Sequence, residues 1–200
     1  MQERVQGRVR ERMVLQVPVV IEGVRLRLRR STPADAAATY EIARDPEVMR
    51  YMEWPAPQRL ADTQHFFDGC AARWQTGAEY HWMIESKADG SAIGCIGCRI
   101  KGHAADFGYF LARTAWGQGY ASEAAGLLVN WFRRQNSIVR IAATTDAANS
   151  ASAAVLQKVG LQREGLMRKA TVRPNFDGAP KVTPRDTLLF ASVKPDRTSP

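Results

Sequence analysis

The sequence predicts a mixed α/β domain whose central sheet is mostly antiparallel and contains one parallel pair of strands. Three observations carry this prediction: strand-like segments joined by short turns, a glycine turn that leads directly into an amphipathic helix, and a strand on each side of that helix. Short turns join antiparallel neighbours, whereas a strand–helix–strand step can make two strands parallel. The 200 residues suffice for one hydrophobic core, and the 45% apolar and 24% charged composition is typical of a folded protein.

The first half of the chain predicts a strand, two helices and an antiparallel meander. Apolar and basic residues alternate strictly over residues 24–29, as in a half-exposed strand. Pro55 and Pro57 separate the two helices, and Asp89-Gly90 and Lys101-Gly102 mark the turns of the meander. The predicted elements are strand 24–29, a helix that begins within 31–35, helix 60–74, and strands 81–85, 92–100 and 106–111.

The second half predicts two helices that alternate with two strands. Ala124, Leu128 and Phe132 recur at helical spacing. Asn149 is a suitable N-cap for the second helix, and Gly160 follows its end. The predicted elements are helix 120–134, strand 140–145, helix 150–159 and strand 187–192.

The three cysteines do not form an even disulfide framework. Cys95 and Cys98 have the C-x-x-C spacing, but they lie in a predicted strand, where residues three apart point to opposite faces. No further Cys or His pair lies nearby to complete a zinc site. We therefore expect buried thiols and no metal, and unpaired thiols favour a reducing, cytoplasmic location.

Arginines are enriched near the N-terminus, where they precede an apolar stretch over residues 13–21. Gln16 and Pro18 interrupt this stretch and no small-residue cleavage site follows, so a signal peptide is not expected. No apolar run reaches the roughly 20 residues that a membrane helix needs. We expect a basic extension over residues 1–20, a single domain over 21–194 and a frayed tail over 195–200. The net charge of +8 suits nucleic acid or an anionic ligand.

The most informative segment runs from Asp106 to Ala124, where a strand enters a turn with Gly117 and Gly119 and then a helix. Backbone amides at a helix start have no internal partner and, with the helix dipole, bind anions such as phosphate. Neither the lysine of a P-loop nor the third glycine of a Rossmann fingerprint is present, because Ser122 occupies that glycine's position. The segment indicates a site for a phosphorylated ligand, and the alternative is that the glycines are only hinges.

The segment Trp116-Gly-Gln-Gly-Tyr-Ala121 resembles the acetyl-CoA pyrophosphate loop of the GNAT superfamily, Gln/Arg-x-x-Gly-x-Gly/Ala. Gly119 and Ala121 match this pattern, and Trp116 stands in place of Gln or Arg. The continuation to Ala124 is similar to RimJ/RimL-type N-acetyltransferases. Three further segments are similar to that family in the same order: residues 45–52, 106–111 and 149–165.

The resemblance implies the GNAT acyl-CoA N-acyltransferase fold, with a mostly antiparallel sheet that is flanked by helices and splayed at the acetyl-CoA site. Acetyl-CoA would be the co-substrate, and no metal is implied. Pantetheine would lie beside the strand that ends at Phe110-Leu111. The implied cofactor-binding residues are Phe110, Leu111, Trp116, Gly117, Gln118, Gly119, Tyr120, Ala121, Asn149 and Ser152.

For catalysis the resemblance implies direct attack of an amine on the thioester. Asp106 is the leading candidate for the base that takes the amine proton, and His103 is the secondary one. Ser152 is a candidate acid for the leaving thiolate, or else a helix serine bonded to backbone. Tyr51, Met52 and Trp54 lie on the link that lines the acceptor side in the family, or else pack in the core. His65 and His81 are interpreted as packing or surface residues.

The resulting hypothesis is an N-acetyltransferase that acts on a primary amine, either a protein N-terminus or a small molecule. The acceptor classes include ribosomal proteins, and both a monomer and a homodimer remain open. One alternative is an acyl-CoA-binding or sensing domain without turnover. Another is a nucleic-acid-binding module, which requires a clustered basic patch with aromatic residues, whereas the arginines here are spread along the chain.

Overall fold

The computed structural model describes residues 15–176 and 183–195. Most of the predicted basic extension, residues 1–14, and of the predicted tail, residues 196–200, lies outside the described residues. The described chain enters the fold at Leu15 and Val17, which pack against the core. The indole of Trp82 donates a hydrogen bond of 3.0 Å to the Pro18 carbonyl. This bond holds the residues before the first strand against the sheet.

The described strands form one eight-stranded sheet in the order β1-β2-β3-β4-β5-β6-β8-β7. The pair β5–β6 is parallel and the other described pairs are antiparallel, which confirms the predicted mixed sheet. The strands are β1 Val20–Glu22, β2 Leu26–Arg30, β3 Tyr80–Ser86, β4 Ala92–Lys101, β5 Ala104–Leu111, β6 Arg140–Asp146, β7 Gln162–Val172 and β8 Pro184–Val193.

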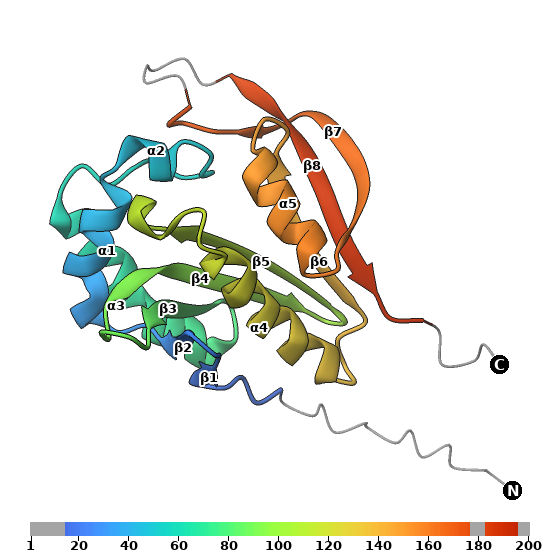
Figure 1. Cartoon of the computed structure of the whole chain (residues 1–200), viewed down its shortest axis with the longest axis horizontal. Coiled ribbons are helices and arrows are strands. Elements are labelled where there is room, and N and C mark those ends of the chain that lie inside the picture. The colour runs from blue at the N-terminus through green and yellow to red at the C-terminus, as the bar shows by residue number, and fades with distance from the viewer. Residues whose placement is uncertain (1–14, 177–182, 196–200) are drawn as a thin grey trace, which may run out of the picture.

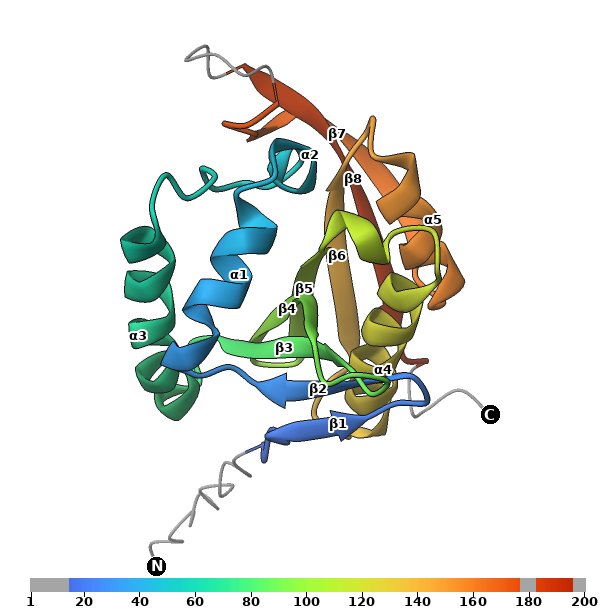
Figure 2. The same ribbon diagram turned by 60° about the vertical axis from the view of Figure 1, so that its left-hand side comes forward.

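Helices cover both faces of the sheet (Figure 1). Figure 2 shows α1 and α3 on one side of the strands, and α4 and α5 on the other. No helix in residues 15–176 or 183–195 combines the length and apolar character needed to span a bilayer. The helices are α1 Ala36–Ala43, α2 Pro46–Met49, α3 Leu60–Thr76, α4 Tyr120–Arg134 and α5 Ser150–Lys158, and 3₁₀ turns occupy Pro33–Asp35 and Arg113–Ala115.

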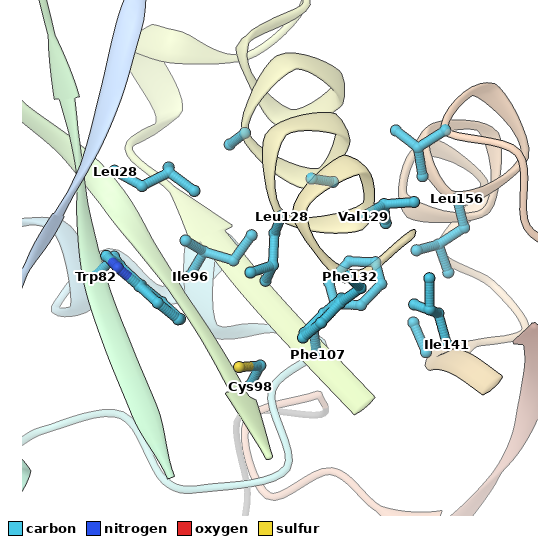
Figure 3. Close-up of a cluster of buried hydrophobic side chains, with 14 of the residues drawn as sticks. Leu28, Trp82, Ile96, Cys98, Phe107, Leu128, Val129, Phe132, Ile141 and Leu156 are labelled. Atoms are coloured by element: carbon cyan, nitrogen blue, oxygen red, sulfur yellow. The ribbon is translucent and has the colours of Figure 1, made fainter. Parts of the chain in front are cut away.

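The main hydrophobic core lies between α4 and the sheet (Figure 3), where Leu128 and Phe132 of α4 are fully buried. Cys98 belongs to this core, whereas Cys95 packs with Phe67 on the α1–α3 face. The two thiols thus lie on opposite faces of β4, as strand alternation predicts. Burial raises the pKa of the Cys95 thiol to about 12, so this thiol stays protonated at neutral pH.

The sheet opens between its two parallel strands. β5 pairs with β6 only from Ala104 to Asp106. Beyond that point β5 continues to Leu111 beside β4, while β6 continues to Asp146 beside β8. The strands therefore separate after three paired positions, and backbone groups that face the gap become available to a ligand.

Two strands extend beyond the sequence prediction. The predicted strand 24–29 corresponds to β2, which begins two residues later because the 89% exposed Val24 lies in the turn after β1, a strand that was not predicted. β7 is an edge strand that was not predicted, because its residues are largely exposed and show no apolar alternation. It pairs with β8, which begins at Pro184 rather than at residue 187.

Candidate functional site

The opening between β5 and β6 is the floor of a large pocket with a volume of about 1250 Å³. The pocket extends from the link after α2 to the loop before α4 and the start of α5. Three of the predicted site residues, His103, Gln118 and Tyr120, do not line it. The predicted residues that do line it are Tyr51, Met52, Trp54, Asp106, Phe110, Leu111, Trp116, Gly117, Gly119, Ala121, Asn149 and Ser152.

The loop before α4 has the conformation that its glycines permit. Gly117 has φ 72° and Gly119 has φ 79°, values in the left-handed region that favours glycine. Gly119 is the N-cap of the 15-residue helix α4. The indole of Trp116 donates a hydrogen bond of 3.0 Å to the Leu111 carbonyl, which ties the loop to the end of β5. The first amides of α4 thus lie at the pocket, where they suit an anionic group.

Arg25 holds this loop from the outside and was not identified from the sequence. Its Nη1 donates to the Gln118 carbonyl at 2.9 Å, and its Nε donates to Oε2 of Glu123 at 2.8 Å. Its guanidinium also lies 4.5 Å from the centre of the Tyr120 ring. Because these contacts join the β1–β2 turn to both the loop and the first turn of α4, Arg25 holds the loop in place without a ligand.

Two hydroxyl groups meet at the side of the opening nearest to α5. Asn149 caps α5 and accepts a hydrogen bond of 3.1 Å from the Ser152 amide. The Ser152 hydroxyl lies 3.2 Å from the Tyr109 hydroxyl. Burial raises the pKa of Tyr109 to about 12, although the hydrogen bond with Ser152 acts in the opposite direction. The sequence analysis missed Tyr109, whose alternating position in the predicted strand 106–111 was the available signal.

Asp106 lies on the other face of β5, at the last position paired with β6. Its Oδ1 accepts hydrogen bonds of 2.9 and 2.8 Å from Nε and Nη2 of Arg99 on β4. The side chain is 42% exposed, and its Oδ2 is left for a further partner. His103 lies in the turn before β5, where its carbonyl accepts hydrogen bonds from the amides of Val139 and Arg140.

The link after α2 is held against the far end of the sheet. Asn175 donates from Nδ2 to the Met49 carbonyl at 2.9 Å and to the Trp54 carbonyl at 2.8 Å. Arg173, whose side chain is 3% exposed, donates to the Tyr51 carbonyl and lies 3.3 Å from the carboxylate of Asp146. These contacts place Tyr51, Met52 and Trp54 on the pocket wall.

A family model described as an acetyltransferase (GNAT) domain matches residues 25–162. The chain belongs to the GNAT acetyltransferase family. It is 30% identical over 179 residues to YoaA, an uncharacterised N-acetyltransferase of Bacillus subtilis, and the match covers 88% of this chain and 97% of YoaA. The family and this relative identify an acyl-CoA-dependent acetyltransferase.

Two solved structures, at less than 25% identity, share the fold of this chain. RimJ of Mycobacterium smegmatis, in complex with CoA-disulfide, has a TM-score of 0.73 at 24% identity, over 90% of this chain and 87% of that one. The Salmonella typhimurium enzyme that modifies the N-terminal serine of ribosomal protein L7/L12 has a TM-score of 0.75 at 20% identity, over 88% of this chain and 99% of that one.

Gly108 supplies a first test of the pocket in this acetyltransferase. A Cβ at Gly108 would meet nothing within 4 Å, although the residue lines the pocket at the opening. We expect Gly108→Val to fold normally, because its side chain enters open space, and to lose at least about 10-fold in acetyl transfer because it occupies ligand volume. Thermal melting and thiol release from acetyl-CoA measure the two effects.

Gly165 on β7 is the matched control, since a Cβ there also meets nothing within 4 Å and the residue does not line the pocket. Gly165→Val should keep the wild-type rate. A wild-type rate of acetyl transfer by Gly108→Val would show that the ligands do not bind at the β5–β6 opening.

Proposed function

We propose that the protein transfers the acetyl group of acetyl-CoA to a primary amine, by direct attack of the amine in a ternary complex. The observation that carries this proposal is the position of the β5–β6 opening between the start of helix α4 and the pocket wall formed by the link after α2. One pocket thus offers a place for a phosphorylated carrier and, on the opposite side, for an acceptor. Solved relatives in complex with coenzyme A, or with acetyl-CoA and AMP, support this assignment of the carrier.

The residues present fit an acetyl-CoA arm. The amides at Gly119 and after it would bind the pyrophosphate. A Cβ at Gly117 would meet nothing within 4 Å, so the backbone there is open to close approach by a ligand. The unpaired edge of β5 from Phe107 to Leu111 offers backbone groups to the pantetheine amides, as when an added strand extends a sheet.

Acetyl transfer needs a donor for the leaving sulfur and an acceptor for the amine proton. We assign the donor to the Tyr109–Ser152 hydroxyl pair, because the raised pKa of Tyr109 keeps its proton in place at neutral pH. Asp106 is on the opposite face of β5, where its carboxylate would attract an acceptor ammonium. A backbone amide near Leu111 would stabilise the oxyanion.

Tyr109→Phe is expected to lower kcat by about 100-fold if the phenol donates the proton. Ser152→Ala should have a smaller effect, because Tyr109 keeps its hydroxyl, and the double variant should lose less than the product of the two single losses. Steady-state kinetics of thiol release give these values. Equal and fully multiplicative losses would show that the two hydroxyls do not act as a pair.

A panel of amine acceptors with detection of free CoA thiol tests the proposed function. It should include peptides with free N-termini, since the similar ribosomal-protein acetyltransferases act on such groups, together with small amines and amino acids. We propose a protein N-terminus or a small-molecule amine as acceptor, and the three buried thiols suit a cytoplasmic location. Acetyl-CoA binding without turnover on any acceptor would favour the alternative, a non-catalytic acyl-CoA-sensing domain.

A further inference from the structure

Four charged or titratable side chains meet at the acceptor side of the pocket, on three neighbouring strands. Glu79 directly precedes β3, His81 lies on β3, Arg99 on β4 and Asp106 on β5, and all four line the pocket. The sequence analysis interpreted His81 as a packing or surface residue. Its side chain is 18% exposed, so it is a wall residue of the pocket and not part of the hydrophobic core.

The sheet register places His81 beside two glycines in the same row. His81 pairs with Gly97, and Gly97 pairs with Gly108. A Cβ at Gly97 would lie 2.6 Å from Cε1 and 2.8 Å from Nδ1 of His81, so this edge of the imidazole lies directly over Gly97. Gly108 is two residues past Asp106, where β5 and β6 have separated. Because neighbouring strands are about 5 Å apart, the ring is within reach of a ligand at the opening, directly or through one water.

Two neighbours fix the orientation of the ring. Phe66 of α3 packs edge-on against it, with 5.0 Å between the ring centres. Nε2 lies 3.2 Å from Oε2 of Glu79. The hydrogen-bonding interaction with His81, together with the positive charges of Arg73 and Arg99, lowers the pKa of Glu79, although burial acts in the opposite direction. Glu79 therefore stays a carboxylate and favours a proton on Nε2, which leaves the lone pair on Nδ1.

We propose that His81, oriented by Glu79, is the general base that takes the amine proton at Nδ1, directly or through one water. The inference rests on the proposed function and names a residue outside the expected catalytic set. The amine lone pair forms the N–C bond to the acetyl carbon, and the C–S bond breaks. The proton of the amine goes to Nδ1, and the thiolate sulfur receives a proton from the Tyr109–Ser152 pair.

The other charged groups at the site leave this role to His81. Asp106 is engaged through Oδ1 by two hydrogen bonds from Arg99, and Arg73 lies 3.5 Å from Oε2 of Glu79. No hydrogen bond joins Nδ1 of His81 to a described residue, whereas Nε2 is buried with no hydrogen-bond acceptor other than the Glu79 carboxylate 3.2 Å away. Among the described carboxylates and imidazoles of this cluster, Nδ1 of His81 is therefore the atom that this orientation leaves free to accept a proton.

The first experiment determines which ring nitrogen of His81 carries the proton, and it needs no amine acceptor. The ¹⁵N chemical shifts of His81, followed over pH in the wild-type protein, should show the neutral ring protonated at Nε2. Glu79→Gln should reduce the preference for this tautomer. A neutral ring protonated at Nδ1 would overturn the proposal, whatever the kinetics show.

The second experiment compares His81→Asn with His65→Asn, an exposed histidine of α3 that does not line the pocket. With an acceptor from the amine panel, His81→Asn should lower kcat/KM by about 100-fold and remove the acid limb of its pH profile. Acetyl-CoA affinity should stay unchanged, and His65→Asn should match the wild type. The His81→Asn defect should shrink with an acceptor whose amine is already neutral at the assay pH.

The outcomes separate this proposal from the function on which it rests. A wild-type protein that acetylates no amine overturns the proposed function and the base together. An active wild type with an unaffected His81→Asn variant overturns only the base. If Asp106→Asn removes the acid limb and His81→Asn does not, Asp106 is the base.

Discussion

Replacing Gly119 by valine is expected to abolish the rise in melting temperature that acetyl-CoA gives the wild-type protein. Gly119 has φ 79°, a conformation that costs a β-branched residue at least about 1–2 kcal/mol. A side chain at this position would also lie close to Nη2 of Arg25, which would be 3.5 Å from the new Cβ. Both effects act where the pyrophosphate would bind.

The size of the effect follows from mass action. A ligand at 100 times its dissociation constant stabilises the folded state by about 2.7 kcal/mol, and the variant should lose all of that shift. Gly126→Ala is the matched control: it lies in α4, where a Cβ would meet Val159 at an ordinary 3.8 Å, and it should keep the shift. A full shift in Gly119→Val would contradict the assignment of this loop to the carrier.

The central helix and its glycine loop were predictable because local chemistry decides them. The apolar face of α4 recurs at helical spacing, and Gly117 and Gly119 mark the turn that needs left-handed backbone. The predicted strands of the meander agree with β3, β4 and β5 to within a few residues. Short turns and alternation fix such elements without reference to distant parts of the chain.

Contacts between distant segments could not be predicted in the same way. Tyr109 and Ser152 are separated by 43 residues, and Arg25 and Glu123 by 98. The role of His81 depends on Gly97 and Gly108, whose place beside it follows only from the register of three strands. A one-residue shift would reverse the face of every side chain, and composition alone does not determine that register.

The far wall of the pocket depends on a buried charge that was also invisible in the sequence. Asp146 at the end of β6 is 1% exposed and lies between two arginines from β8 and the end of β7. Arg185 donates to it at 2.7 Å from Nε and at 3.1 Å from Nη2. Arg173 joins this group to the link after α2, through the Tyr51 carbonyl. The carboxylate therefore connects β6, β8 and the acceptor wall.

Burial acts to raise the pKa of Asp146, but hydrogen bonds from Arg185 and the Ala148 amide outweigh burial and hold the pKa below its usual 3.8. A lowered native pKa means that the folded state favours the ionised form more than the unfolded state does. The contribution of Asp146 to stability is therefore present above about pH 4 and is lost as the pH falls through the lower native pKa.

Asp146→Asn is expected to lower the free energy of unfolding at pH 7 by about 3 kcal/mol, because it leaves two arginines without their shared buried anion. Urea unfolding measures this loss, and the difference from the wild type should shrink as the pH falls below about 4. Glu41→Ala is the control: its partner Arg44 lies 3.4 Å away, both side chains are more than half exposed, and its removal should cost less than about 0.5 kcal/mol.

The acceptor KM of Asp146→Asn should rise while acetyl-CoA affinity stays unchanged, since Arg173 supports the Tyr51 link and not the glycine loop. A variant as stable as the wild type at pH 7 would show that the two arginines do not depend on this carboxylate.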